Sequence, residues 1–405
     1  MSRMPGAPTG LASWCEIDAV ALWANVALLR RRLSPGALLG IVVKSDAYGH
    51  GLVPCAREFV AAGADWLVVN AADEAQCLRQ AGIEAPLYVC ARVPAAQCEV
   101  AARAAARVVL CDAEDALPLA QAGRRAGRTV SVHLKIETGT HRQGLPVQGA
   151  LELGRLVQRL DGLELEGLTT HYADIEDTTD HAFARRQLQL LEEARQAFAA
   201  AGLVPTMVHS ANSAATMLWP ETHSSLVRVG LAAYGLWPSR ETFATALQRA
   251  ADGSDTWLPQ LTPVLSWRAR LGQVKEVPAG GYVGYGRTFR ATHPMRIGIV
   301  PVGYFEGFDR RLSNVGHVLV HGVRAPVRGR VCMNMVLVDL THIPQAAPED
   351  AVTLLGRDGD EQVSADQWAA WMHSINYEVV SRIHPGQPRL LRRADGGLEE
   401  PAPPA

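Results

Sequence analysis

The sequence predicts an α/β fold in which an N-terminal (β/α)8 TIM-like barrel precedes a C-terminal antiparallel β domain. Over the first 235 residues, short apolar runs alternate eight times with helix-like stretches, a texture typical of parallel β/α units. After about residue 255 the helical spacing nearly vanishes, and short alternating runs separated by Gly, Pro and Asp indicate antiparallel strands. An open doubly wound sheet is the alternative for the first part, but its usual G-x-G-x-x-G fingerprint does not follow the first strand.

The candidate barrel strands are the eight apolar runs at 38–43, 66–70, 86–90, 107–111, 129–136, 163–170, 206–209 and 226–229. Stretches between them, such as 183–200, place apolar residues every three or four positions, which is the periodicity of an amphipathic helix. The candidate strands of the second domain lie at 264–277, 296–302, 317–320, 335–340 and 351–355. The join falls within 251–260, so we expect domains at 14–250 and 251–392, followed by a polar, Pro-rich and disordered tail at 393–405.

The composition argues against several classes of function. A net charge of −2 gives no electrostatic reason to expect nucleic acid or an anionic membrane as partner. No window approaches the ~18 uninterrupted apolar residues of a membrane span, and the N-terminus has no signal-peptide pattern. The seven cysteines are scattered without a C-x-x-C pair, so we expect neither a disulfide scaffold nor a structural metal site, and a reducing cytoplasm fits best.

Lysine is scarce, because only Lys44, Lys135 and Lys275 occur among 39 basic residues. Lys44 ends the first apolar run, within IVVKSDAYGHG, at the end of a strand where barrel enzymes hold their active sites. A partly buried lysine loses some of its preference for the charged form, so it can form a Schiff base or act as a base. An arbitrary lysine at a strand end is more often a plain surface residue, and the motif around Lys44 decides between the two interpretations.

VKSDAYGHG resembles the cofactor-lysine motif of the alanine racemase family, whose usual form is V-K-A-N-A-Y-G-H-G. Eight further motifs with family counterparts follow in order: LKIETGTHRQG at 134–144, THYA at 170–173, HSANSAA at 209–215, RVGLAAYG at 228–235, GYVGYGRTF at 281–289, VGYFEGF at 302–308, GRVCMN at 329–334 and INYEV at 375–379. The resemblance covers roughly residues 14–390. It implies a fold-type III pyridoxal 5′-phosphate (PLP) racemase of L- and D-alanine, for peptidoglycan or alanine catabolism, that works as a head-to-tail homodimer.

The resemblance implies two bases on opposite faces of the substrate α-carbon. Lys44 would hold PLP as a Schiff base and then act on one face, while Tyr285 of the partner subunit would reach the other face. Removing a proton on one side and delivering one on the other inverts the carbon without moving the substrate. Arg228 would face the pyridine nitrogen and, since arginine only donates hydrogen bonds, would keep it unprotonated and weaken the ring as an electron sink. His171 would link Arg228 to Tyr285 and stack on the ring.

Further residues would bind the cofactor and the substrate. The cofactor phosphate would be bound by Tyr48, Ser213, Tyr377 and the backbone amides of Gly230 and Leu231 after the eighth strand, with Asn212 shaping the same loop. Arg142 would lie near the cofactor phenolate and the substrate carboxylate, to which Met333 of the other subunit would donate a backbone N–H. Lys135 stands where many family members carry a carbamate, an anion that would orient Arg142, whereas two unmodified cations side by side would repel. No metal is expected.

The sequence departs from the family pattern at several positions, some of them near the expected substrate entrance. Asn334 stands where the family has Asp, and Phe305 and Glu306 replace Ala-Asp. Ser45 and Asp46 replace Ala-Asn beside the cofactor lysine, and Thr140 and His141 replace a Met-Gly-type pair. Alanine is the first expectation for the substrate, with serine or a broader set of amino acids as the alternative. Three other functions are weighed: a decarboxylase, against which Arg228 argues, a PLP-binding barrel without racemase activity, which would lack the β domain, and a barrel enzyme without PLP.

Overall fold

The computed structural model describes residue 8 and residues 10–400 of the chain. The chain divides into two compact units. We call residues 22–47 and 52–262 the barrel unit, and the described residues of 10–21, 48–51 and 263–400 the β unit. The expected division into domains at 14–250 and 251–392 stays a prediction. Within the described range no helix combines the length and the apolar character needed to cross a membrane.

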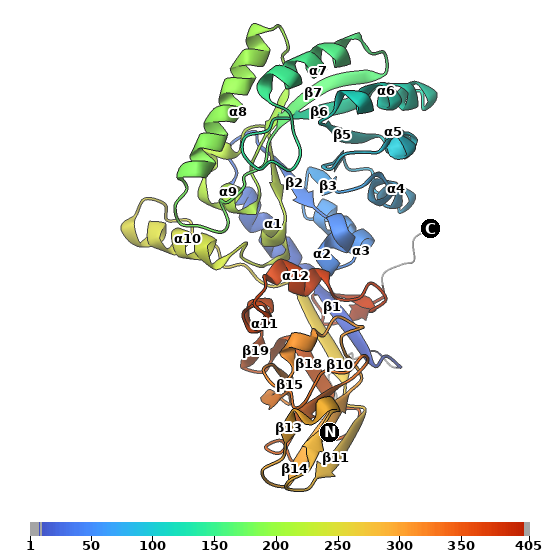
Figure 1. The fold of residues 1–405 in the computed structure, drawn as a ribbon, viewed down its shortest axis with the longest axis vertical. Helices are drawn as coiled ribbons and strands as arrows, with labels where there is room; N and C mark the ends of the chain where they lie inside the picture. Colours follow the sequence, from blue (N-terminus) through green and yellow to red (C-terminus); the bar gives the residue numbers. More distant parts are fainter. Residues whose placement is uncertain (1–7, 9, 401–405) are drawn as a thin grey trace. The chain divides into compact units, whose positions relative to one another are not determined.

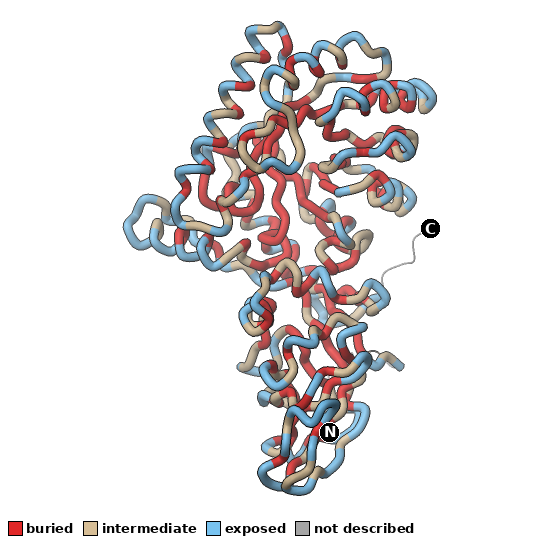
Figure 2. Tube along the Cα trace, viewed as in Figure 1, coloured by how far each residue is buried: buried red, intermediate tan, exposed pale blue. Residues whose placement is uncertain are grey.

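Eight parallel strands form a nearly closed barrel in the first of these units, which confirms the predicted fold class. They pair in the order β8-β7-β6-β5-β4-β3-β2-β9, and each predicted run holds one of them (Figure 1). The strands are β2 (Leu38–Val42), β3 (Trp66–Val69), β4 (Leu87–Val89), β5 (Ala106–Leu110), β6 (Val130–Lys135), β7 (Leu163–Thr169), β8 (Met207–His209) and β9 (Leu226–Val229). β3, β4 and β9 are buried along their whole length (Figure 2), which explains why parallel strands read as continuous apolar runs.

Helices follow the strands and cover the outside of the barrel (Figure 1). The α-helices are α1 (Ala19–Arg32), α3 (Leu52–Ala61), α4 (Ala72–Gln80), α5 (Cys98–Arg103), α6 (Ala116–Arg125), α7 (Val147–Arg159), α8 (Ala182–Ala200), α9 (Ser213–Leu218) and α10 (Arg240–Asp252). Four 3-10 turns are η1 (Ala95–Gln97), η2 (Ala113–Asp115), η3 (Pro220–Thr222) and η4 (Leu231–Tyr234). The expected helix at 183–200 corresponds to α8.

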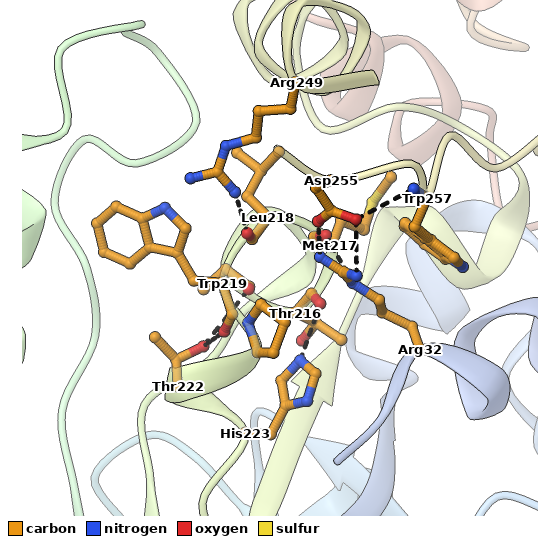
Figure 3. Close-up of polar contacts among 12 residues, drawn as sticks. Arg32, Thr216, Met217, Leu218, Trp219, Thr222, His223, Arg249, Asp255 and Trp257 are labelled. Atoms are coloured by element: carbon orange, nitrogen blue, oxygen red, sulfur yellow. Dashed lines mark hydrogen bonds and ion pairs between the residues drawn. The ribbon is translucent and has the colours of Figure 1, made fainter. Parts of the chain in front are cut away.

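The segment that follows α10 is fixed to the barrel by Arg32, the last residue of α1. The Arg32 guanidinium forms a two-pronged ion pair with Asp255 and donates from Nε to the Met217 carbonyl at 3.0 Å (Figure 3). It also lies 5.0 Å from the centroid of the Trp257 ring. Burial raises the pKa of Asp255, but the hydrogen bond and charge of Arg32 outweigh it, so the net pKa is lowered. The first residues after α10 are therefore held to the barrel unit by an ion pair.

The β unit contains three sheets, in which all strand pairs but one are antiparallel. The largest has the order β16-β15-β18-β10-β1-β20-β21 with β19 beside β18, the second has the order β11-β14-β17, and the third pairs β12 with β13. Its strands are β1 (Ser13–Asp18), β10 (Leu265–Arg270), β11 (Gln273–Val277), β12 (Tyr282–Val283), β13 (Phe289–Arg290), β14 (Met295–Val300), β15 (His317–Val320), β16 (Val323–Pro326), β17 (Val336–Asp339), β18 (Ala351–Asp358), β19 (Glu361–Val363), β20 (Arg389–Arg392) and β21 (Leu398–Glu399). Lys275, for which no role is predicted, lies exposed on β11.

Three features of the β unit differ from the expectation. β1, from the start of the chain, pairs antiparallel with β10 and parallel with β20. Two helices, α11 (Ala365–Met372) and α12 (Asn376–Ser381), lie in the region where helical spacing nearly vanishes. A capping box starts α11, because Ser364 and Gln367 exchange side-chain and backbone hydrogen bonds. Residues 398–399 of the expected tail pair with β20 as β21, and residues 401–405 of that tail lie outside the described residues.

Candidate active site

Lys44 follows β2 and opens a left-handed turn, α2 (Lys44–Gly49). Residues 45–48 all have φ between 52° and 55°, although none is glycine, and this conformation costs roughly 1–2 kcal/mol per residue. Such a backbone persists only where its surroundings hold it. Glu74 accepts a hydrogen bond from the Ser45 N–H at 2.6 Å, and Asp46 accepts one from the first residue of α3 at 2.8 Å. The position of Lys44 is therefore fixed by a strained turn with contacts on both sides.

Four of the predicted cations act on one histidine. His171 follows β7, and its pKa lies well below the ordinary value, first because burial disfavours the charged ring. The positive charges of Arg228, Lys135, Arg142 and Lys44 lower it further, in that order. His171 and the four cations come from the carboxyl ends of four strands, β2, β6, β7 and β9, or from the loops after them. The barrel thus brings the residues predicted from separate motifs together around a neutral imidazole.

Arg228 is buried on β9, and its partners use most of its donors. Nη2 donates to the carbonyls of Thr170 at 2.9 Å and Ser210 at 3.1 Å, and Nη1 lies 2.6 Å from His209 Nδ1. Burial lowers the pKa of Arg228, yet arginine keeps its proton in proteins. The residue is therefore a fixed cation that can only donate, as the sequence predicts.

Lys135 is the last residue of β6 and only 8% exposed. Burial, together with the charges of Arg228 and Arg142, lowers its pKa from 10.5 to about 8. Arg142 lies in the exposed loop after β6, directly after His141, which has a φ of 50°. About a tenth of the Lys135 amine is therefore neutral, and thus nucleophilic, at pH 7, far more than for an ordinary lysine.

The predicted phosphate-binding residues of the barrel unit lie together after β8 and β9. The Gly230 N–H donates to Ser213 Oγ at 2.9 Å, directly before η4, which begins at Leu231. Asn212 caps α9, because its Oδ1 accepts from the Ala215 N–H at 2.9 Å. It also donates to Glu176 at 2.8 Å. Asn212 therefore links the start of α9 to the segment around Glu176.

Tyr48 and Tyr377 form the corresponding pair in the β unit. Their ring centroids lie 6.0 Å apart at an interplanar angle of 56°. Arg389 ties the two segments together, since its guanidinium donates to the Gly49 carbonyl at 3.0 Å and to the Ile383 carbonyl, beyond α12, at 3.1 Å. The tyrosines thus belong to one preformed group, although they are 329 positions apart in the sequence.

Tyr285 and Met333 line one pocket of the β unit, together with Arg330. Tyr285 stands in a 3-10 turn, η5 (Tyr285–Arg287), between Gly284 and Gly286, whose φ values of 72° and 71° suit glycine. Its side chain is 72% exposed, and that of Met333 is 55% exposed. Both predicted residues are therefore presented at the surface of their own unit.

Two departures from the family pattern contact each other beside this pocket. Asn334 donates to Glu306 Oε1 at 2.7 Å, and Glu306 Oε2 accepts from the Gly303 N–H at 2.7 Å. Phe305 stacks on His384, with ring centroids 4.7 Å apart. Glu306 and Asn334 therefore form one unit, in which the amide can donate where a second carboxylate would repel.

Behind Arg228 lies a largely buried polar group that the motifs do not predict, made of His209, His133 and Glu166. His209 Nε2 lies 2.6 Å from His133 Nδ1, and His133 Nε2 lies 2.8 Å from Glu166 Oε2. His209 ends β8, so the strand-end position that selected His171 was also a signal for it. His133 and Glu166 lie within strands, where a polar residue inside an apolar run was the only sign.

The fold and the site define an enzyme built on a (β/α)8 barrel, in which two lysines and two arginines gather around a buried histidine at the carboxyl ends of the strands. Residues 17–238 match the family model described as alanine racemase, N-terminal domain, and residues 264–391 match alanine racemase, C-terminal domain. The chain belongs to the alanine racemase family. This result confirms the predicted family and the predicted class of enzyme, an amino-acid racemase.

Relatives agree over nearly the whole chain. The alanine racemase of Symbiobacterium thermophilum is 40% identical over 378 residues, covering 93% of this chain and 96% of the relative. The crystal structure of alanine racemase from D-cycloserine-producing Streptomyces lavendulae is similar with a TM-score of 0.86, 35% identity and coverage of 95% and 98% of the two chains. The structure from Bacillus anthracis with bound L-Ala-P gives a TM-score of 0.87, with 32% identity and 97% coverage of each chain.

Proposed function

We propose that this racemase interconverts L- and D-alanine with PLP as its cofactor. The observation that carries the proposal is the convergence of Lys44, Lys135, Arg142 and Arg228 on the neutral His171. This group offers an amine for a Schiff base and positive charges for an anionic cofactor and a substrate carboxylate. When bound, PLP supplies an electron sink for the electron pair that remains on the α-carbon after the proton leaves.

The donors and acceptors on these residues fit that cofactor. Arg228 is donor-only and held by His209, so it would face the ring nitrogen without giving up a proton. Lys44 would carry the covalent bond from its fixed turn. The residues that would bind the phosphate are Ser213, the backbone amides of Gly230 and Leu231, and the tyrosines Tyr48 and Tyr377, with Asn212 holding the loop.

The proton would be moved by two side chains of the protein. The Lys44 amine would take or give it on one face of the α-carbon, and the Tyr285 phenol of the partner subunit on the other. Tyr285 is 72% exposed in its own unit, which supports its use by a second copy. His171 would connect Arg228 to that phenol, while Arg142 and the Met333 backbone N–H of the partner subunit would hold the carboxylate. A homodimer with shared sites is therefore part of the proposal.

Lys135 is proposed to be carbamylated. Its neutral amine would add to carbon dioxide, forming one N–C bond and releasing one proton to solvent, and the product is an anion. Its pKa of about 8 and the two neighbouring guanidinium groups support the modification, since an anion between Arg228 and Arg142 would be paired. A carbamate would also orient Arg142.

The finer points of the function are proposals of the same kind. We expect alanine to be the preferred substrate, with serine or a broader set as the alternative, since Phe305, Glu306 and Asn334 alter the surroundings of the Met333 pocket. D-alanine would serve peptidoglycan synthesis or arise in alanine catabolism. A cytoplasmic location is supported by the cysteines, because none of the seven forms a disulfide.

The test is an assay with each of the twenty amino acids and chiral separation of the products, combined with α-hydrogen exchange in deuterium oxide from each alanine enantiomer. Lys44→Ala should abolish both racemisation and the visible band of the cofactor. Tyr285→Phe should slow exchange from L-alanine by about 10²–10⁴-fold, the usual contribution of a general base, and exchange from D-alanine less. Tyr282→Phe is the matched control, since Tyr282 is also exposed and lies three positions away.

A colourless protein that takes up no PLP would refute the cofactor assignment. Equal damage to both directions in Tyr285→Phe would refute the assignment of faces. Specific activity should fall on dilution as the dimer dissociates, and full activity in a monomer would refute the shared site.

A further inference from the structure

Buried hydrogen bonds connect Arg228 to Glu166 through two imidazoles. Arg228 Nη1 lies 2.6 Å from His209 Nδ1, His209 Nε2 lies 2.6 Å from His133 Nδ1, and His133 Nε2 lies 2.8 Å from Glu166 Oε2. Arg107 Nε donates to the same carboxylate at 2.8 Å. Both imidazoles are fully buried, and the Glu166 side chain is 15% exposed. We call Glu166, His133 and His209 the relay.

The two ends of the relay determine every proton within it. Arginine only donates, so His209 Nδ1 must be an unprotonated acceptor. A carboxylate only accepts, so His133 Nε2 must carry a proton. The remaining hydrogen bond then runs from His209 Nε2–H to His133 Nδ1, because the reverse would place an imidazolium beside an imidazolate. Both rings are therefore neutral, with the proton on Nε2.

The titration of the three groups agrees with this pattern. Burial lowers the pKa of His133 and lowers that of His209 well below the ordinary value, and the charge of Arg228 adds to both effects. Burial raises the pKa of Glu166, but hydrogen bonds from His133 and Arg107 outweigh it and the net pKa is lowered. Glu166 is therefore an anion near neutral pH, and the rings are not cations.

The backbone of β6 and β7 is shaped around the relay. Val132 pairs with Leu165 and His133 pairs with Gly167, so the register skips Glu166. An irregularity of this kind re-aims a side chain, and it accompanies the contact of Glu166 with His133. A Cβ at Gly167 would lie 2.7 Å from His133 Nδ1, so glycine is the residue that leaves room for the ring. Strand register and side-chain size both serve the same contact.

We propose that Glu166, whose own ion pair is with Arg107, is a positioning residue for Arg228 that acts through His133 and His209. Among the described residues no carboxylate forms an ion pair with Arg228, whose hydrogen-bond partners are His209 and two carbonyls. The negative charge at the far end polarises both rings, strengthens His209 Nδ1 as an acceptor, and so fixes one edge of the guanidinium. The other edge would then face the cofactor ring as a weaker donor, a consequence that rests on the proposed function.

The first test reads the protons directly, in the cofactor-free enzyme. Neutron diffraction from perdeuterated wild-type crystals should show deuterium on Nε2 and none on Nδ1 of both His133 and His209. Deuterium on either Nδ1 would overturn the proposal. This test needs no substitution and no activity, so it holds even if a variant fails to fold. A protein that binds no PLP but shows these protons would refute the proposed function and leave the relay intact.

The second test removes the charge at the far end. Glu166→Gln keeps an oxygen for His133 but no anion, and Glu164→Gln makes the same change at an exposed position of the same strand. Coupling through such a network is worth about 0.5–2 kcal/mol, so kcat should fall about 2- to 30-fold with KM unchanged. The visible band of the bound cofactor should shift in Glu166→Gln and not in Glu164→Gln. A Glu166→Gln enzyme with wild-type spectrum and kcat would overturn the proposal.

Discussion

Replacing Lys135 with methionine should stabilise the protein in carbonate-free buffer. The lowering of the Lys135 pKa from 10.5 to about 8, at about 1.4 kcal/mol per pH unit, corresponds to about 3 kcal/mol lost by burying the charged amine. The unfolded chain binds this proton more tightly, so the full penalty applies below pH 8. It disappears as the pH rises from 8 to 10.5, and wild-type stability should rise relative to Lys135→Met across that window.

Calorimetric unfolding of the cofactor-free protein at pH 7 measures this difference. A domain of about 150–250 residues gains about 2–4 °C in Tm per kcal/mol, so Lys135→Met should unfold about 6–12 °C higher than wild type without carbonate. Lys275→Met, at an exposed lysine, is the matched control and should match wild type. Bicarbonate should raise the Tm of wild type and Lys275→Met, because carbamylation acts on the folded state, and not that of Lys135→Met.

Two outcomes would refute the reasoning in different places. A Lys135→Met protein that is no more stable than wild type without carbonate would mean that Lys135 carries no burial penalty. An equal gain from bicarbonate in Lys135→Met would mean that the anion acts elsewhere. In that case a mass spectrum of gently handled wild-type protein should lack the added carbon dioxide.

The remaining predictions concern the supports of the site. Asp255→Asn should lower stability by about 1–3 kcal/mol at pH 7. Because the pKa of Asp255 is lowered, its ion pair stabilises the wild-type protein above the ordinary aspartate pKa near 4, and this stabilisation fades below that pH. The same difference in Tm between wild type and Asp255→Asn at pH 7 and at pH 3 would contradict the ion pair. Gly303→Ala would place a Cβ against the Met333 carbonyl and should raise KM for alanine without changing PLP affinity. Unchanged kinetics would argue against the close packing of Gly303 on Met333. Glu74→Gln weakens the acceptor of the Ser45 N–H. It should speed amide hydrogen exchange in the left-handed turn, measured by mass spectrometry, and weaken PLP binding. Unchanged exchange would show that Glu74 does not hold the turn.

The barrel could be predicted because its strands are buried on both faces. A strand such as β9 (Leu226–Val229) is apolar throughout, so the run itself marks the element. The helices α11 and α12 were not predicted, because they are short and follow a region of alternating strands. The S-x-x-Q pattern at 364–367 was a local signal for α11, since it predicts the capping box that the structure contains.

The candidate site was predictable as a set of residues and not as a geometry. Motifs supplied Lys44, Arg228 and His171, but the positive φ values of residues 45–48 have no glycine or asparagine to announce them. They depend on Glu74, an acceptor from a distant position in the chain. Glu166 likewise joins the relay only because the register of two strands skips it. Pairwise contacts between remote segments decide both features, and no local pattern records them.

The unequal access of the three lysines makes the protein a convenient substrate for bioconjugation. Lys275 is exposed on β11, Lys135 is 8% exposed, and Lys44 is half-buried. Among the three lysines, an amine-reactive dye or surface linker would therefore find one open side chain. A single fluorophore at Lys275 would report rotation and association of the whole enzyme while both lysines of the barrel stay unmodified.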